Sequence, residues 1–313
     1  MRSRWVDNTR GFAIYLVVLG HCIQYASHAG YEFSQNKIFE IIYSFHMPLF
    51  MLISGYLFWH SLAKYTLTEG IITKLKGIMV PCMSWGFITY ILDVVLNKWK
   101  PISIIGYLYY TYYSNWFLWA VFYCSLVVIF TKYIFKNNWI GYIVILIFNY
   151  VLPVVGNLTG AKRLLPFFIL GIVLKQYSVF EAIQHKYNKA VVLLVLVLLY
   201  ILSMLFCNNT ELITGTMGSL LVCFFFKNAS DYWKFEWLNK LGQVSIGIYL
   251  FTGIIFYFFI KEYCRISESY RYIIRAVYIV GLSIILTILA YILCTLLRKN
   301  QITNRLFMGR SCK

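Results

Sequence analysis

Stretches of mainly apolar residues alternate along the whole chain with short polar loops. A helix needs roughly 20 mainly apolar residues to cross the ~30 Å hydrocarbon core of a bilayer. The pattern therefore predicts ten transmembrane helices in one all-α bundle, at residues 11–28, 38–59, 78–97, 115–132, 139–156, 164–178, 190–207, 212–227, 243–260 and 272–297. The sixth and eighth stretches are short for a span, which favours tilted or broken helices there.

One further segment has a different composition. Residues 101–113 include four tyrosines between Tyr109 and Tyr113. Tyrosine is enriched where a membrane meets water. We therefore expect this segment to lie along the membrane surface, with a short half-helix as the alternative.

The overall composition excludes a soluble protein. Of the 313 residues, 61% are hydrophobic and 12% are charged, whereas an average soluble domain has about 25% charged residues. A soluble core could not enclose so many apolar side chains and leave so few charges for its surface. Since the loops are short, we expect one transmembrane domain over residues 1–313, surrounded by membrane lipids and without a fused soluble domain.

The positive charge lies in the loops. The formal net charge is +17, but Lys and Arg occur in short runs rather than on one face or arm, which argues against nucleic-acid binding. With the N-terminus in the cytoplasm, 18 Lys and Arg fall on the cytoplasmic side and nine on the external side. Cytoplasmic loops of membrane proteins carry such an excess. We therefore predict that both termini are cytoplasmic.

Ionisable side chains within apolar segments are costly in a membrane and are candidates for function. Arg10 and His21 are 11 positions apart, so they nearly share one face of a helix and lie about 16 Å apart along its axis. Asp7 precedes Arg10 by three residues, a spacing that permits an ion pair. His46 enters from the opposite side of the membrane and falls at about the same depth as His21.

The two histidines fit two structural roles. They can line one cavity, or each can be a buried neutral imidazole bonded to a backbone carbonyl or a hydroxyl. Two histidines without a third ligand at the same depth fall short of a catalytic zinc site. We therefore predict that no metal is bound.

Two blocks of sequence resemble a known family. Residues 7–21 read DNTRGFAIYLVVLGH, and residues 44–57 read SFHMPLFMLISGYL. The first block resembles the opening helix of the integral-membrane acyltransferase family three, with its Arg, ten residues and His. The second is similar to that family's second block, especially in its fucose O-acetylase-like, polysaccharide O-acetyltransferase branch. Weaker similarities follow in order at residues 115–118, 165–171 and 245–250.

The resemblance implies a multi-pass enzyme of the bacterial inner membrane that O-acylates a carbohydrate. Its donor would be cytoplasmic acetyl-CoA, and its acceptor a surface polysaccharide or a lipid-linked glycan precursor. The family's first-helix Arg and His map onto Arg10 and His21. The chain departs from the family at Lys74 and Lys76, where members often carry an RxxR-like motif, and at Thr252, where members often have His.

These residues suggest how the donor is bound. Arg10 is expected to hold a phosphate of CoA, because a guanidinium binds such groups through paired hydrogen bonds. Asp7 would fix the Arg10 side chain. Lys74 and Lys76 are the remaining candidates for contact with the donor.

The two histidines would carry the chemistry. His21 is expected to act as the general base, since the ordinary pKa of an imidazole is close to neutral. His46 would orient the acceptor or the other histidine. The alternative is a transporter of glycan precursors in which His21 and His46 relay protons. Such carriers usually contain inverted repeats, and no repeat is visible in this sequence.

Overall fold

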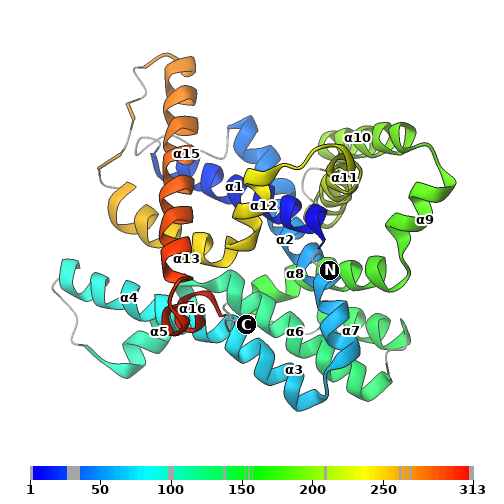
Figure 1. Cartoon of the computed structure of the whole chain (residues 1–313), viewed down its shortest axis with the longest axis horizontal. Coiled ribbons are helices and arrows are strands. Elements are labelled where there is room, and N and C mark those ends of the chain that lie inside the picture. The colour runs from blue at the N-terminus through cyan, green and yellow to red at the C-terminus, as the bar shows by residue number, and fades with distance from the viewer. Residues whose placement is uncertain are drawn as a thin grey trace. The chain divides into compact units, whose positions relative to one another are not determined.

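The computed structural model describes residues 3–26, 36–97, 102–136, 139–151, 153, 156, 158–207, 210–260, 263–264, 266–267 and 270–309. The regular structure within these ranges is helical and includes no β-strand (Figure 1). Six of the described helices are long and apolar enough to cross a membrane, or up to eight if each of two bent helix pairs is one span. The predicted all-α polytopic class is therefore confirmed. The count of ten and the cytoplasmic termini stay predictions.

The helices belong to two compact units. The first consists of Met1–Phe50 and Phe180–Leu296, and the second consists of Met51–Val179 and Leu297–Lys313. Helix α2 (Lys37–Lys64) contributes its first half to the first unit and its second half to the second. This division describes contacts within the chain, and the single transmembrane domain stays a prediction.

The first unit contains α1 (Arg4–Ala26) and the elements that pack against it. These are α11 (Glu211–Tyr232), α12 (Glu236–Gln243), α13 (Ser245–Ile255) and the π-helical segment η3 (Phe256–Ile260). The unit also includes α9 (Val179–Lys186), α10 (Lys189–Phe206) and α15 (Tyr272–Leu297). The chain bends by 77° between α12 and α13. This bend brings the start of α13 next to α1, where Ser245 of α13 accepts a hydrogen bond from Arg10.

The backbones of α1 and α12 are in direct contact, which two glycines make possible. A Cβ atom at Gly11 would lie 1.9 Å from the carbonyl oxygen of Leu238. On the other helix, a Cβ atom at Gly242 would lie 1.9 Å from the carbonyl oxygen of Asp7. No larger residue fits at either position without moving a backbone, so these glycines fix α12 against the polar start of α1.

The second unit contains the rest of α2 and the helices that follow it along the chain. They are α3 (Leu67–Lys74), the π-helical η2 (Leu75–Met79), α4 (Val80–Asn97), α5 (Ile104–Ser114), α6 (Trp116–Phe135), α7 (Trp139–Val151) and α8 (Leu158–Gln176), together with the C-terminal α16 (Gln301–Met308). Helices α2 and α8 repeat the glycine contact, since a Cβ at Gly55 or Gly171 would lie 1.9 Å from a carbonyl oxygen of the other helix.

Two sequence predictions about individual segments can be compared with these helices. Residues 101–113 were expected at the membrane surface or as a half-helix, and α5 is a short helix capped by the Ser103 side chain. Only 6% of helix α10 is buried within the protein. Its apolar side chains therefore face outward, as lipid contact requires. Among the charges behind the predicted orientation, four external ones lie outside the described residues: Lys98, Lys100, Lys261 and Arg265.

Candidate active site

The polar start of α1 is buried within the first unit. Asp7 is 3% exposed and Asn8 is fully buried. The Asn8 side-chain amide donates a hydrogen bond of 2.8 Å to the hydroxyl of Ser230 on α11. Because this contact and the glycine contact with α12 both fix the rotation of α1, the face that carries Arg10 and His21 has a defined direction.

Arg10 lies at the bend between α12 and α13. Its Nη2 donates a 2.7 Å hydrogen bond to the hydroxyl of Ser245, which is the first residue of α13. A helix begins with backbone N–H groups that have no partner within the helix, and it carries a partial positive charge there. A guanidinium and a helix N-terminus therefore meet at one point, an arrangement that suits an anionic group such as a phosphate. The ion pair of Arg10 with Asp7 stays a prediction.

His21 lies further along the same face of α1 and is half-buried. Its Nδ1 is 3.2 Å from the side-chain oxygen of Gln24. An amide oxygen only accepts hydrogen bonds, so in the neutral ring this contact favours the tautomer with the proton on Nδ1 and with Nε2 as the acceptor nitrogen. The imidazole packs beside the rings of Tyr25 and Phe256, with centroids 5.8 and 5.3 Å away.

His46 lies on the part of α2 that belongs to the first unit, and it is 3% exposed. Its Nδ1 donates a 2.8 Å hydrogen bond to the carbonyl oxygen of Ile42, one turn earlier. This is the backbone bond expected of a buried neutral imidazole. It also fixes the orientation of the ring.

The two histidines are connected through Gln24 and Tyr43. The Tyr43 hydroxyl lies 3.5 Å from the Gln24 oxygen, and the Tyr43 ring lies 4.5 Å from the ring of His46. A Cβ atom at Gly20 would lie 2.7 Å from the Tyr43 ring, so the glycine before His21 makes room for this tyrosine. We refer to His21, Gln24, Tyr43 and His46 as the histidine cluster.

Sequence reasoning assigned no role in the site to Gln24, Tyr43 or Ser245, although Ser245 begins the block 245–250 that resembles the family. Gln24 follows His21 by three residues, and Tyr43 precedes His46 by three. Residues three apart lie on the same face of a helix, so a search for polar residues at this spacing would have found both. Ser245 gives no such signal, because its position depends on the bend before α13.

Lys74 and Lys76 lie in the second unit, whereas Arg10 lies in the first. The Lys74 ammonium is 4.0 Å from the centroid of the Phe58 ring, a distance at which a cation is attracted to an aromatic face. Lys76 is exposed on η2. Their action on the same donor as Arg10 stays a prediction.

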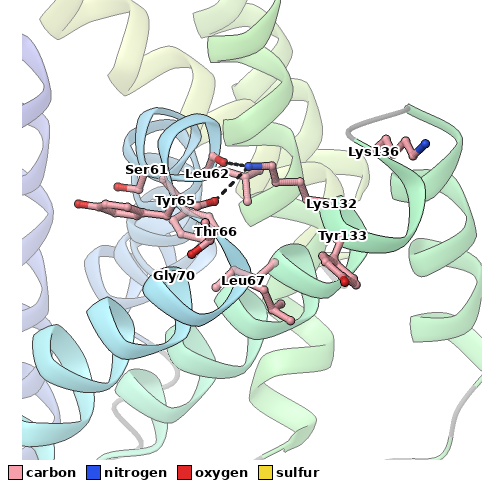
Figure 2. A pocket seen from close by; sticks show the side chains of 11 residues that line it. Ser61, Leu62, Tyr65, Thr66, Leu67, Gly70, Lys132, Tyr133 and Lys136 are labelled. Carbon is pink, nitrogen blue, oxygen red and sulfur yellow. Dashed lines mark hydrogen bonds between the residues drawn. The ribbon is translucent and has the colours of Figure 1, made fainter.

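The second unit also contains a cavity of about 480 Å³, lined by the end of α2, by α3 and by the end of α6. Lys132 extends from α6 to the carbonyl oxygens of Leu62 and Tyr65 (Figure 2). These carbonyls lie at the end of α2, where the helix itself supplies no donors. The ammonium therefore caps α2 and closes one side of the cavity.

No group of three or more His, Cys, Asp and Glu side chains that could hold a metal ion occurs within the described ranges. The histidine cluster supplies two imidazoles from neighbouring helices, and its other members are an amide and a phenol. The prediction that the protein binds no metal stays a prediction.

Comparisons with known proteins add the following findings. A family model described as an acyltransferase domain matches residues 3–296. A nodulation protein NolL from Mesorhizobium japonicum is 32% identical over 127 residues, which is 37% of this chain and 32% of the relative. A nodulation protein NolL from Sinorhizobium fredii is 29% identical over 191 residues, 58% of this chain and 51% of the relative. The chain thus spans about a third of the first relative's length and about half of the second's. No solved structure matches it.

Proposed function

The chain belongs to the membrane acyltransferase family three, and on this premise we propose that it acetylates a sugar hydroxyl. The donor is cytoplasmic acetyl-CoA, and the acceptor is a surface polysaccharide or its lipid-linked precursor. The proposed location is the bacterial inner membrane, which the apolar helices support. One observation carries the proposal: a guanidinium beside a helix N-terminus and an imidazole bonded through Nδ1 to an amide oxygen lie on one face of α1.

Arg10 is proposed to bind the phosphates of CoA. Its guanidinium can form paired hydrogen bonds with a phosphate, and the first N–H groups of α13 next to Ser245 add further donors. Arg10 and His21 are separated by about 16 Å along α1. In the proposed complex the extended arm of CoA runs along this face and carries its thioester towards His21.

His21 is proposed to act as the general base. The sugar hydroxyl attacks the thioester carbonyl while Nε2 of His21 takes the hydroxyl proton. The carbon–sulfur bond then breaks, and the proton passes from His21 to the departing thiolate. The products are an acetyl ester of the sugar and free CoA. His46 is proposed to orient the acceptor or the other histidine.

The experiment compares the acetyl content of surface glycan, by mass spectrometry, in cells that carry each variant at equal protein level. His21→Ala should abolish acetylation, because a missing general base typically costs on the order of 10²–10⁴ in rate. His46→Ala should be impaired rather than inactive. His185→Ala is the matched control, since His185 is exposed on α9, outside the cluster, and it should acetylate like the wild type.

Two results would contradict the proposal. Full acetylation by His21→Ala would remove the proposed base. Alternatively, His21→Ala could reduce the amount of glycan exported and leave its acetyl fraction unchanged. That result would favour the transporter, in which the histidines relay protons.

A further inference from the structure

Gln24 receives two hydrogen bonds at one oxygen atom. Its Oε1 is 3.2 Å from Nδ1 of His21 and 3.5 Å from the hydroxyl of Tyr43. Both partners can donate, so the amide oxygen is the acceptor for both. With this acceptor present, the Nδ1 proton of His21 has a fixed partner, and the ring keeps its Nε2 free.

Tyr43 is held on several sides. Its ring stacks on Phe39 with centroids 3.8 Å apart, and it lies beside His46 at 4.5 Å. On the third side it fits against Gly20, where any side chain would overlap with it. Since the ring has little room to move, its hydroxyl is kept in place beside Gln24.

The Gln24–Tyr43 hydrogen bond therefore joins α1 to α2, and each of the two imidazoles has a hydrogen-bond partner at Nδ1. A group that hydrogen-bonds to one ring nitrogen of a histidine fixes the tautomer and the orientation of the ring, so that the other nitrogen can react. Metal-bound histidines are held in this way. His46 has the Ile42 carbonyl as its partner. His21 depends on a side chain, and that side chain is in turn held by Tyr43.

We propose that Gln24 and Tyr43 are positioning residues for acyl transfer. Gln24 holds His21 in the tautomer whose Nε2 can accept a proton, and Tyr43, whose ring packs beside His46, fixes the Gln24 oxygen. This inference rests on the proposed function for its effect on activity. The geometry that it describes can be tested separately.

The first test measures transfer of labelled acetyl from acetyl-CoA to glycan in inverted membrane vesicles of the host cell, which hold the natural acceptor. Gln24→Leu keeps the volume of the side chain and removes the acceptor. It should lower kcat about 10–100-fold, the range known for groups that orient metal-bound histidines. The KM for acetyl-CoA should be unchanged, because Arg10 is untouched.

Gln24→Glu separates positioning from packing. The carboxylate still accepts from Nδ1 of His21, so this variant should recover most of the activity that Gln24→Leu loses. An anion at this place also favours the protonated imidazole. The base is then lost to protonation at a higher pH, so the acidic limb of the pH–rate profile should move to higher pH. A side chain that only fills space would not produce this shift.

Tyr43→Phe tests the bond to Gln24. It removes one hydroxyl, and kcat should fall less than in Gln24→Leu. Combined with Gln24→Leu it should cause no further loss, because both changes break the same hydrogen bond. Tyr200→Phe is the matched control. Tyr200 lies on α10, and its hydroxyl bonds to Ser44 on α2, next to Tyr43 but outside the histidine cluster. This variant should keep wild-type activity.

The tautomer itself is measured by ¹⁵N NMR of protein labelled at histidine. Nδ1 of His21 should carry the proton in the wild type and should lose this preference in Gln24→Leu. An unchanged tautomer, or wild-type kcat with an unchanged pH profile in Gln24→Leu, would overturn the inference. Failure of the proposed function looks different: wild-type vesicles would transfer no acetyl, or His21→Ala would remain active, and the NMR result would still decide the role of Gln24.

Discussion

The glycine contact between α1 and α12 makes a sharp prediction about stability. In Gly11→Ala the new methyl group would lie 1.9 Å from the carbonyl oxygen of Leu238, and real contacts are not shorter than 3.0 Å. The two backbones must therefore separate by at least about 1.1 Å. The obstructing atom belongs to a backbone and not to a flexible side chain, so the strain cannot be relieved by a change of rotamer.

The magnitude follows from two opposing effects. Overpacking a tight interface typically costs about 1–3 kcal/mol, and a backbone obstacle places Gly11→Ala at the upper end. Replacing a helical glycine by alanine stabilises the helix by about 1 kcal/mol, because alanine has the higher helix propensity. We expect a net loss of about 2 kcal/mol. At Gly281 in α15 nothing lies within 4 Å of the new methyl group, so Gly281→Ala should instead gain about 1 kcal/mol.

The shift should also affect Arg10. If α12 carries the start of α13 with it, the bond from Arg10 to Ser245 would lengthen from 2.7 Å to about 3.8 Å, which is too long for a hydrogen bond. Donor binding should therefore weaken in Gly11→Ala and not in Gly281→Ala. The assays are the thermal midpoint of the detergent-purified protein, followed by size-exclusion chromatography, and acetyl-CoA affinity. A Gly11→Ala protein as stable as Gly281→Ala would refute the reasoning.

Three further predictions follow from other parts of the chain. Arg10→Lys keeps the charge and loses the planar fork, so acetyl-CoA should bind about tenfold more weakly by calorimetry; wild-type affinity in Arg10→Ala would contradict the assignment. Lys132→Met removes the cap of α2 and should lower stability by about 1–2 kcal/mol, seen as a lower thermal midpoint, whereas an unchanged midpoint would mean that the cap contributes little. Reporter fusions after Lys136 and Lys240 should be cytoplasmic, and an external C-terminal reporter would overturn the predicted topology.

Hydropathy predicted the elements better than their shapes. The stretch 272–297 corresponds closely to α15, because a long apolar run in a membrane protein has no other stable conformation. The stretch 164–178 overlaps α8, which begins earlier, at Leu158, and the stretch 243–260 begins at the 77° bend between α12 and α13. Hydropathy cannot predict such a bend, because the bend depends on packing between helices and leaves the local composition unchanged.

α1 shows why its polar residues indicated a candidate site. It forms a helix of 23 residues, yet it is not among the described helices that are apolar enough to cross a membrane. Polar groups that reduce its hydropathy have partners in other helices of the same unit: Asn8 has Ser230, Arg10 has Ser245, and Gln24 has Tyr43. A buried polar group without a partner costs free energy. The sequence therefore revealed which helix carries polar chemistry.

The partners could not be read in the same way. Ser230, Ser245 and Tyr43 come from three other helices, and each is an ordinary residue in its own segment. Their importance arises only when the backbones approach, and the approach depends on glycines that leave no hydropathy signal, such as Gly11 and Gly20. Because a methyl group at Gly11 would displace a backbone by about 1.1 Å and one at Gly20 would overlap with the Tyr43 ring, the small residues beside Arg10 and His21 are as necessary for the proposed site as the polar residues themselves.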